Sequence, residues 1–321
     1  MPEEQQQPKQ PPGNLATIGF IVILSVVCAT VLAILSSALA KPQKVAKELD
    51  RSIQMMIAAK VMNHEGKFLV QNDEGKYVEA KYTEDGYLEP GESDSLPGRD
   101  EIITVYRKRF KPYLVNQEGD VVTFEDAGIN EEDYVSENKK EGYYKLKYKL
   151  IYEIMPNVKD ETSDTKPIGY VIPVNGFGLW DAIYGYLAVK PDGNTVIGIS
   201  WYDQKETPGL GANIADAEWQ DHFPGKHIFQ AGADGTASFE SSPVGIIVVR
   251  GKVSEVLGES PKAKSAVDGM AGATLTGNGV TKAYKDVLNA YRPFFIKIHD
   301  NTDGGDVSSQ SRTYNGGRRV R

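Results

Sequence analysis

One long apolar run dominates the start of the chain. Residues 15–40 carry no charged side chain. At about 1.5 Å of rise per residue, a helix of this length exceeds the roughly 30 Å hydrocarbon core of a bilayer. A cleaved signal peptide is the alternative, because residues 38–40 resemble a small-residue cleavage site. The run is longer than a signal core and follows the acidic Glu3 and Glu4, so we predict an uncleaved transmembrane helix.

The segments around this run have different patterns. Apolar positions recur at helical spacing after it, which predicts a juxtamembrane helix over residues 41–62 that continues from the membrane. The Gln- and Pro-rich residues 1–14 and the Gly-, Ser- and Arg-rich residues 303–321 are predicted to be disordered tails, the second of them basic. Residues 63–165 are charged and rich in tyrosine, and within them residues 144–150 alternate between apolar and lysine, which predicts a strand with one wet face.

The remaining sequence predicts a hairpin, a strand and a helix. Two apolar runs, 182–189 and 195–201, flank the turn sequence Lys-Pro-Asp-Gly-Asn, which is typical of a β-hairpin. Residues 244–250 predict a further strand. Near the end of the chain, apolar residues at helical spacing predict a helix with one apolar face that ends at Pro293. The residues of this face are Val280, Tyr284, Val287, Leu288 and Tyr291. We therefore predict an α+β protein, with a single N-terminal transmembrane helix followed by a soluble domain that has an antiparallel sheet and flanking helices.

Composition and charge exclude several classes of function. The chain has 321 residues, a net charge of −8 and one cysteine, Cys28, inside the apolar run. A single cysteine can form neither an internal disulfide nor a cysteine metal cluster. An acidic chain without a basic stripe is not expected to bind nucleic acid. His222 and His227 are separated by a Pro-Gly loop, so they do not form a helical metal pair, and no metal site is predicted.

The orientation of the membrane helix is ambiguous in the charge pattern. Lys41, Lys44 and Lys47 follow the apolar run, and Lys9 precedes it. Taken alone, this asymmetry would leave the large domain in the cytoplasm. Long domains can nevertheless be translocated regardless of such charges.

The candidate chemistry lies directly before the last predicted helix, in residues 268–279. Four glycines permit close backbone approach, Thr276 and Asn278 are helix-capping types, and a helix N-terminus attracts phosphate. The segment lacks the Lys and Ser/Thr that end a nucleotide-binding P-loop. By these residues alone, a helix cap without function is as good an interpretation as an anion site.

Residues 268–274, Asp-Gly-Met-Ala-Gly-Ala-Thr, resemble the flavinylation signal of the covalent FMN-binding domains. Proteins with this signal include the C subunit of the Na⁺-translocating NADH:quinone oxidoreductase and the G subunit of the Rnf complex. Ala271 stands where the signal usually has a hydroxyl residue. A second motif, Glu-Thr-Pro-Gly-Leu-Gly at 206–211, resembles another hallmark of these proteins, and residues 178–180 and 187–196 are more similar to the C subunit. The resemblance covers residues 165–292 and 15–62, and residues 63–165 are interpreted as an enlarged insertion.

The resemblance implies a cofactor and the residues that hold it. FMN would be linked to Thr274 by a phosphodiester, within an FMN-binding core at 166–302. The residues around the phosphate and ribityl chain would be Gly272, Ala273, Leu275 and Thr276. Those against the isoalloxazine ring would be Glu206, Thr207, Gly209 and Leu210, with Trp180 as a further neighbour. Asp268 and Gly269 would belong to the signal, although the carboxylate of Asp268 could instead cap a turn.

The resemblance also implies a cellular setting. The chain would relay single electrons as one member of a membrane complex of six subunits that pumps sodium. A flavin transferase would attach the cofactor, and the soluble domain would lie on the periplasmic side of the inner membrane. The alternatives are an Rnf-type G subunit, a standalone extracytoplasmic flavin carrier, and a membrane-tethered binding module without a redox role.

Overall fold

A computed structural model describes residues 14–303 of the chain, apart from 94, 160–161 and 163. The predicted tails lie outside these residues, except for their inner ends at Asn14 and Asp303, which are helical. The chain divides into two compact units, Met1–Arg51 and Ser52–Arg321, which are described separately.

The first unit contains most of helix α1, Asn14–Ala58. Its segment Thr17–Ala40 is long and apolar enough to cross a membrane, as the apolar run predicted. The helix is continuous through the predicted membrane and juxtamembrane segments, but it ends at Ala58 and not at residue 62. Lys60 adopts a positive φ of 55°, and the Val61 N–H turns back to the Met56 carbonyl, which stops the helix.

The second unit is built on a six-stranded antiparallel sheet with the order β5-β4-β6-β7-β8-β9. Its strands are β4 (Phe110–Val115), β5 (Val121–Val122), β6 (Lys149–Ile154), β7 (Gly169–Phe177), β8 (Ala182–Val189) and β9 (Val196–Asp203). A three-stranded sheet contains β1 (Leu69–Gln71), β2 (Tyr77–Tyr82) and β3 (Leu88–Pro90), and a parallel pair contains β10 (Ile247–Val248) and β11 (Ala266–Val267). The charged segment 63–165 therefore contributes three strands to the central sheet.

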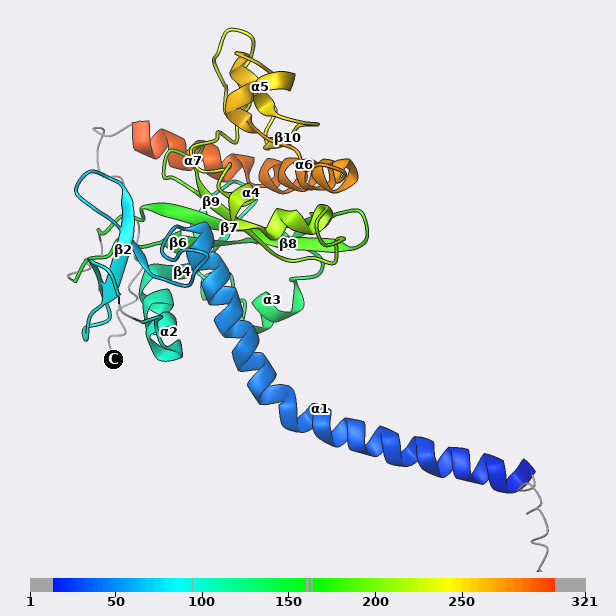
Figure 1. Cartoon of the computed structure of the whole chain (residues 1–321). Coiled ribbons are helices and arrows are strands. Elements are labelled where there is room, and N and C mark those ends of the chain that lie inside the picture. The colour runs from blue at the N-terminus through cyan, green and yellow to red at the C-terminus, as the bar shows by residue number, and fades with distance from the viewer. Residues whose placement is uncertain (1–13, 94, 160–161, 163, 304–321) are drawn as a thin grey trace, which may run out of the picture. The chain divides into compact units, whose positions relative to one another are not determined.

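Helices lie on both faces of the central sheet (Figure 1). The α-helices are α2 (Arg99–Arg109), α3 (Glu131–Glu137), α4 (Ala217–Gln220), α5 (Val253–Val256), α6 (Thr274–Ala290) and α7 (Arg292–Asp303). Short 3₁₀ turns are η1 (Tyr143–Lys145), η2 (Gly211–Ala215) and η3 (Pro261–Ser265). Helices α6 and α7 lie on the face opposite α2 and α3. This arrangement confirms the predicted α+β class.

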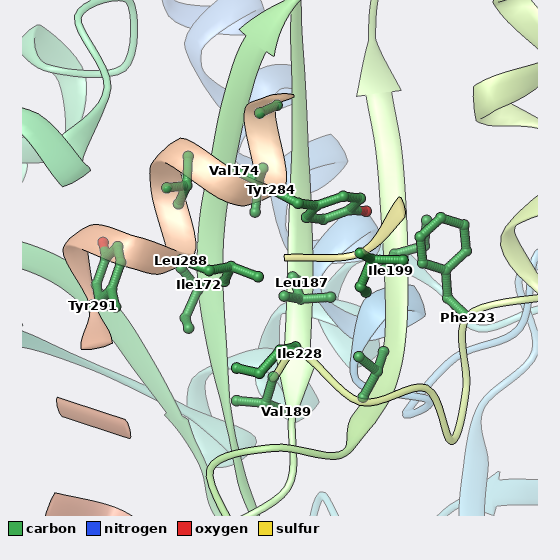
Figure 2. Close-up of a cluster of buried hydrophobic side chains, with 14 of the residues drawn as sticks. Ile172, Val174, Leu187, Val189, Ile199, Phe223, Ile228, Tyr284, Leu288 and Tyr291 are labelled. Carbon is green, nitrogen blue, oxygen red and sulfur yellow. The ribbon is translucent and has the colours of Figure 1, made fainter. Parts of the chain in front are cut away.

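The main core lies between the sheet and helices α6 and α7. Figure 2 shows Tyr284 and Leu288 of α6, and Tyr291 directly after it, in one buried cluster with Ile172 and Leu187 of the strands. Tyr284 is 1% exposed, and its hydroxyl accepts a hydrogen bond of 3.0 Å from the Trp201 ring. The apolar face predicted for the last helix is therefore the face that is buried.

The predicted hairpin is confirmed as β8 and β9, with Leu187 paired to Ile199. Its turn is fixed by Asp192, whose carboxylate accepts hydrogen bonds from the Asn194 and Thr195 N–H groups, both at 2.8 Å. Gly193 supplies a φ of +71°. A side chain there would meet the Phe295 carbonyl at 2.8 Å, so this turn also packs against α7.

Two strand predictions were wrong in extent. Residues 144–148 do not form the alternating strand, because η1 occupies Tyr143–Lys145 and β6 begins at Lys149. Strand β6 lies in the interior of the sheet and has no continuous wet face, since Leu150, Ile151 and Tyr152 are all buried. Within the predicted strand 244–250, only Ile247–Val248 pairs as a strand.

The start of the last predicted helix was placed too late. Helix α6 begins at Thr274, so Thr276 and Asn278 lie inside it and do not cap it. Gly277 and Gly279 lie where the helix closely approaches other segments, and this tertiary packing outweighs their poor helix propensity. Helix α6 ends at Ala290 and not at Pro293. Pro293 stands in the first turn of α7, where its missing N–H removes no helical hydrogen bond.

Replacement of Gly279 by alanine tests the close approach of α6. Alanine at an open helix position would stabilise the helix by up to about 1 kcal/mol relative to glycine. Here its Cβ would lie 2.1 Å from the backbone oxygen of Phe177, so the helix must move. We expect Gly279→Ala to lower the free energy of unfolding by about 2 kcal/mol in urea titrations. Asn278→Ala, at the exposed neighbouring position, is the control, and equal stability of the two variants would contradict the prediction.

Candidate functional site

The glycine-rich segment ends at the start of helix α6. Ala273 is the N-cap residue, and no side chain caps this end of the helix. Thr274 is the first helical residue and is exposed, whereas Ala273 is only 6% exposed. Gly272 adopts a φ of +72°, which turns the chain into the helix. The hydroxyl of Thr274 and the free N–H groups of the first turn are therefore presented together.

A cavity of about 420 Å³ lies at this helix end. Its volume falls within the range typical of small-molecule sites. The lining residues are His222, Val248, Val249, Arg250, Gly251, Lys252, Asp268, Gly269, Met270, Ala271, Gly272, Ala273, Thr274, Gly277 and Asn278. The cavity thus has two main walls, one from residues 268–278 and the other from Val248 of β10 and the following loop 249–252, with His222 as a further lining residue.

Hydrogen bonds fix the two walls to each other. The Gly269 N–H donates to the Gly251 carbonyl at 2.8 Å, and the Val253 N–H donates to the Asp268 carboxylate at 2.7 Å. Gly269 cannot carry a side chain, because a Cβ would lie 2.1 Å from the Val249 oxygen. Asp268 therefore caps the start of α5 from a distant position in the sequence.

A buried carboxylate lies beside the cavity segment. Glu206 is 5% exposed and accepts a hydrogen bond of 2.5 Å from the hydroxyl of Thr276, which is 1% exposed. It also accepts the backbone N–H groups of Leu179 and Trp180 at 3.0 Å. This carboxylate joins the loop after β7, the loop after β9 and the first turn of α6.

Two glycines leave the space for this carboxylate. A Cβ on Gly178 would lie 2.4 Å from Glu206 Oε1. A Cβ on Gly211 would lie 2.4 Å from Thr276 Oγ1 and 2.8 Å from Glu206 Oε2. Side chains at either position would separate the hydrogen-bonding groups.

The surroundings of Glu206 favour its ionised form. Burial raises the pKa of this carboxyl, but the Thr276 hydroxyl and the N–H groups of Trp180, Leu179 and Asp181 together bring the pKa below its ordinary value. Because the lone pairs of the carboxylate are directed at donors, Glu206 is suited to holding these segments together and not to carrying protons.

The lowered pKa predicts a pH dependence of stability. The unfolded chain binds a proton at Glu206 more readily than the folded chain does. The ionised carboxylate therefore stabilises the folded state fully above the ordinary pKa of about 4.5, and this stabilisation is lost as the pH falls through the lower pKa of the folded state. We expect the difference in unfolding free energy between the wild type and Glu206→Gln to shrink between about pH 6 and pH 3. Chemical denaturation across this range measures the difference, and a constant difference would contradict the prediction.

Further contacts extend from this carboxylate to the surface. The ring N–H of Trp180 donates to the Thr207 hydroxyl at 3.1 Å. Leu210 approaches Gly272, where a Cβ would lie 2.8 Å from its side chain. Gly209 adopts a φ of +74° in the turn between Thr207 and Leu210. The surface around these loops and the first turn of α6 carries exposed apolar side chains. The large ones are Phe177, Leu179, Trp180, Leu210 and Leu275.

The structure divides the predicted site residues into two neighbouring groups. Asp268, Gly269, Gly272, Ala273 and Thr274 line the cavity. The other predicted residues, Glu206, Thr207, Gly209, Leu210, Leu275, Thr276 and Trp180, do not line it but belong to the adjoining loops and first turn of α6. Among the described residues, no group of three or more His, Cys, Asp or Glu side chains is placed to hold a metal ion.

Sequence reasoning missed three charged or titratable residues of the cavity, His222, Arg250 and Lys252. The positive charges on either side of Gly251 were the available signal, but the sequence did not show that this loop faces residues 268–274. The glycines at 178 and 211 were also missed as requirements of the site, because the group that each accommodates is distant in the sequence.

Comparison with known proteins assigns the site to a class. Residues 178–289 match the model of the FMN-binding domain, and this segment contains both groups of site residues. The chain is 39% identical to the C subunit of Na(+)-translocating NADH-quinone reductase from Chlamydia muridarum, over 89% of this chain and 94% of that protein.

The same subunit of Haemophilus ducreyi is 31% identical, over 88% of this chain and 93% of its own length. A crystal structure of this subunit from Parabacteroides distasonis is 24% identical, with a TM-score of 0.49, and covers 80% of this chain and 96% of that one. The identities over nearly full lengths show that the chain belongs to the family of the C subunit of Na(+)-translocating NADH-quinone reductase.

The residues at this site fit FMN. A phosphate suits the uncapped N-terminus of α6, where the helix dipole and free N–H groups attract anions. Gly272 and Gly277 line the cavity without side chains, and a Cβ at these positions would meet Leu210 at 2.8 Å and Val248 at 3.0 Å. The exposed apolar side chains beside the cavity could cover one face of a flat aromatic ring.

Proposed function

We propose that this chain is the membrane-anchored electron-transfer subunit of a Na⁺-translocating NADH:quinone reductase, with FMN linked to Thr274 by a phosphodiester. One observation carries the proposal. The exposed Thr274 hydroxyl stands on the wall of the cavity, at the uncapped end of α6. The last residue of a sequence resembling the flavinylation signal therefore stands where the structure can accept a phosphate.

The chain offers two threonines in this short segment, and their surroundings distinguish them. Thr276 is buried and its hydroxyl donates to Glu206, so it is inaccessible to a transferase. Thr274 is exposed. In the attachment, the oxygen of Thr274 forms a bond to the FMN phosphorus of FAD, the bond between the two phosphates breaks, AMP leaves, and the hydroxyl proton is released to solvent.

The residues around the attached group would position it. Gly272, Ala273, Leu275 and the helix N-terminus would lie along the phosphate and ribityl chain. Thr207, Gly209, Leu210 and Trp180 would lie near the ring, and Glu206 with Thr276 would hold their loops in place. FMN, when bound, accepts and returns electrons one at a time, and the protein positions it and tunes its environment.

The location and partners follow from family membership and α1. The helix would anchor the chain in the inner membrane by a single pass, with the soluble domain on the periplasmic side. Its partners would be the five other members of the membrane complex, membrane lipid, and a flavin transferase during maturation. In this assignment the chain relays electrons between neighbouring subunits and does not itself bind NADH or quinone.

Covalent labelling tests the proposal. The full chain is coexpressed with a competent flavin transferase and separated on a denaturing gel under ultraviolet light. We expect a fluorescent band, an intact mass increased by one FMN less one water, and the modified peptide at Thr274. An unlabelled band, from a transferase that labels another known substrate, would overturn the covalent assignment and favour a module without a redox role.

A further inference from the structure

Two cations on one loop face the attachment residue across the cavity. Arg250 and Lys252 line the cavity with Thr274, and both are exposed. In the part of the chain that the structure describes, neither side chain forms an ion pair. Asp268 is the acidic residue among those lining the cavity, and one of its oxygens accepts the Val253 N–H at 2.7 Å. The cavity therefore has an excess of positive charge.

The loop that carries these cations is fixed relative to Thr274. The Val248 N–H donates to the hydroxyl of Thr281 at 2.9 Å, which ties the start of the loop to α6. The Gly251 carbonyl accepts the Gly269 N–H at 2.8 Å between the two cations. The capping of Val253 by Asp268 holds the end of the loop. The backbone positions of Arg250 and Lys252 are thus fixed to the segment that leads to Thr274.

We propose that Arg250 and Lys252 form the cationic half of the phosphate site, opposite the N-terminus of α6. This inference rests on the proposed function. The ligand chemistry is a flavin phosphate, which is present in two successive forms. One is the phosphate pair of the incoming flavin nucleotide, and the other is the finished phosphodiester on Thr274.

Charge balance supports this assignment. A phosphodiester carries one negative charge, and a helix N-terminus offers only a partial positive charge that acts within its first turn. Arginine and lysine supply full charges, and hydrogen bonds from charged donors to phosphate are stronger than those from neutral ones. The single charge of Asp268 offsets at most one of these two cations, and its capping bond directs one oxygen at the backbone of α5.

The assignment also changes the role of Asp268 and Gly269. Both belong to the sequence that resembles the flavinylation signal, and both hold the loop of Arg250 and Lys252 against that sequence. They act as positioning residues for the cations, whatever contact they make with a transferase.

The test compares Arg250→Gln/Lys252→Gln with Lys262→Gln/Lys264→Gln. The second pair removes equal charge from exposed positions on η3, which do not line the cavity. Thermal unfolding of the unloaded proteins first establishes that both variants are folded. Attachment is then timed with purified transferase and FAD, as the growth of covalent flavin fluorescence. Loaded proteins are also compared by the ³¹P chemical shift of the attached phosphodiester.

We expect the rate of attachment at low acceptor concentration to fall about tenfold or more in the cavity variant and to stay unchanged in the control. We also expect a shifted ³¹P resonance in the loaded cavity variant alone. A change in rate alone assigns the cations to the incoming nucleotide, and a change in resonance alone assigns them to the finished phosphodiester. Wild-type values in both measurements overturn the inference. A wild type that takes up no flavin refutes instead the proposed function.

Discussion

Thr274→Ala is expected to abolish covalent flavin attachment and leave the fold intact. The substitution removes the hydroxyl oxygen that would bond to phosphorus. Thr274 is exposed and does not cap α6, so the free energy of unfolding of the unloaded chain should change by less than about 0.5 kcal/mol. Gel fluorescence and intact mass measure the attachment, and chemical denaturation of the unloaded protein measures the stability.

Two other variants make this prediction specific. Thr274→Ser keeps a hydroxyl at the same position and should retain a fluorescent band. Thr276→Ala removes the donor to Glu206 but leaves Thr274 in place, so it should lower the stability and still permit attachment. A Thr274→Ala protein with the mass of one attached FMN would place the linkage on another residue and refute the assignment of Thr274.

The parts of the fold that were predictable depend on local chemistry. The β8–β9 hairpin has a turn whose Pro, Asp and Gly have local conformational roles, and Asp192 bonds to its own turn. The last helix has an apolar face of the correct period, and that face is buried. In contrast, the alternation at 144–150 predicted a strand where η1 forms, because residue pattern alone does not show which segments pair with β4 and β7.

The site was predictable only in part for a related reason. The acceptor segment could be located by its resemblance to a known signal. The start of α6 was misjudged, because Thr276 and Asn278 have the residue types of helix caps but tertiary packing places them inside the helix. Arg250 and Lys252 face Thr274 only because parallel pairing of β10 with β11 brings two distant segments together. Such pairing leaves no signature in the spacing of either segment.

The two groups of site residues are connected through one helix turn. Thr274, at the cavity, and Thr276, which donates to Glu206, are both in the first turn of α6. The same carboxylate holds the backbone of Trp180, whose ring bonds to Thr207. A disturbance at Glu206 should therefore reach both the attachment helix and the exposed apolar surface beside it.

Glu206→Ala is accordingly expected to destabilise the soluble domain by about 3 kcal/mol. The variant would leave the Thr276 hydroxyl and the N–H groups of Leu179 and Trp180 without their acceptor, in a site where Glu206 itself is 5% exposed. Glu206→Gln keeps the shape of the side chain and one acceptor oxygen, but it turns an NH₂ group toward donors. The free energy of unfolding of Glu206→Gln should therefore lie between those of Glu206→Ala and the wild type. Urea denaturation of the unloaded chain measures this order.

The neighbouring ion pair supplies a matched control. Lys205 and Asp181 lie beside Glu206 and form a bridge of 2.5 Å, but Lys205 is exposed, so Lys205→Ala should leave the free energy of unfolding nearly unchanged. Gly211→Ala tests the same buried cluster without removing a charge, because its Cβ would meet Thr276 Oγ1 at 2.4 Å. If Glu206→Ala unfolded at the same urea concentration as Lys205→Ala, the carboxylate would not be what joins these loops to α6.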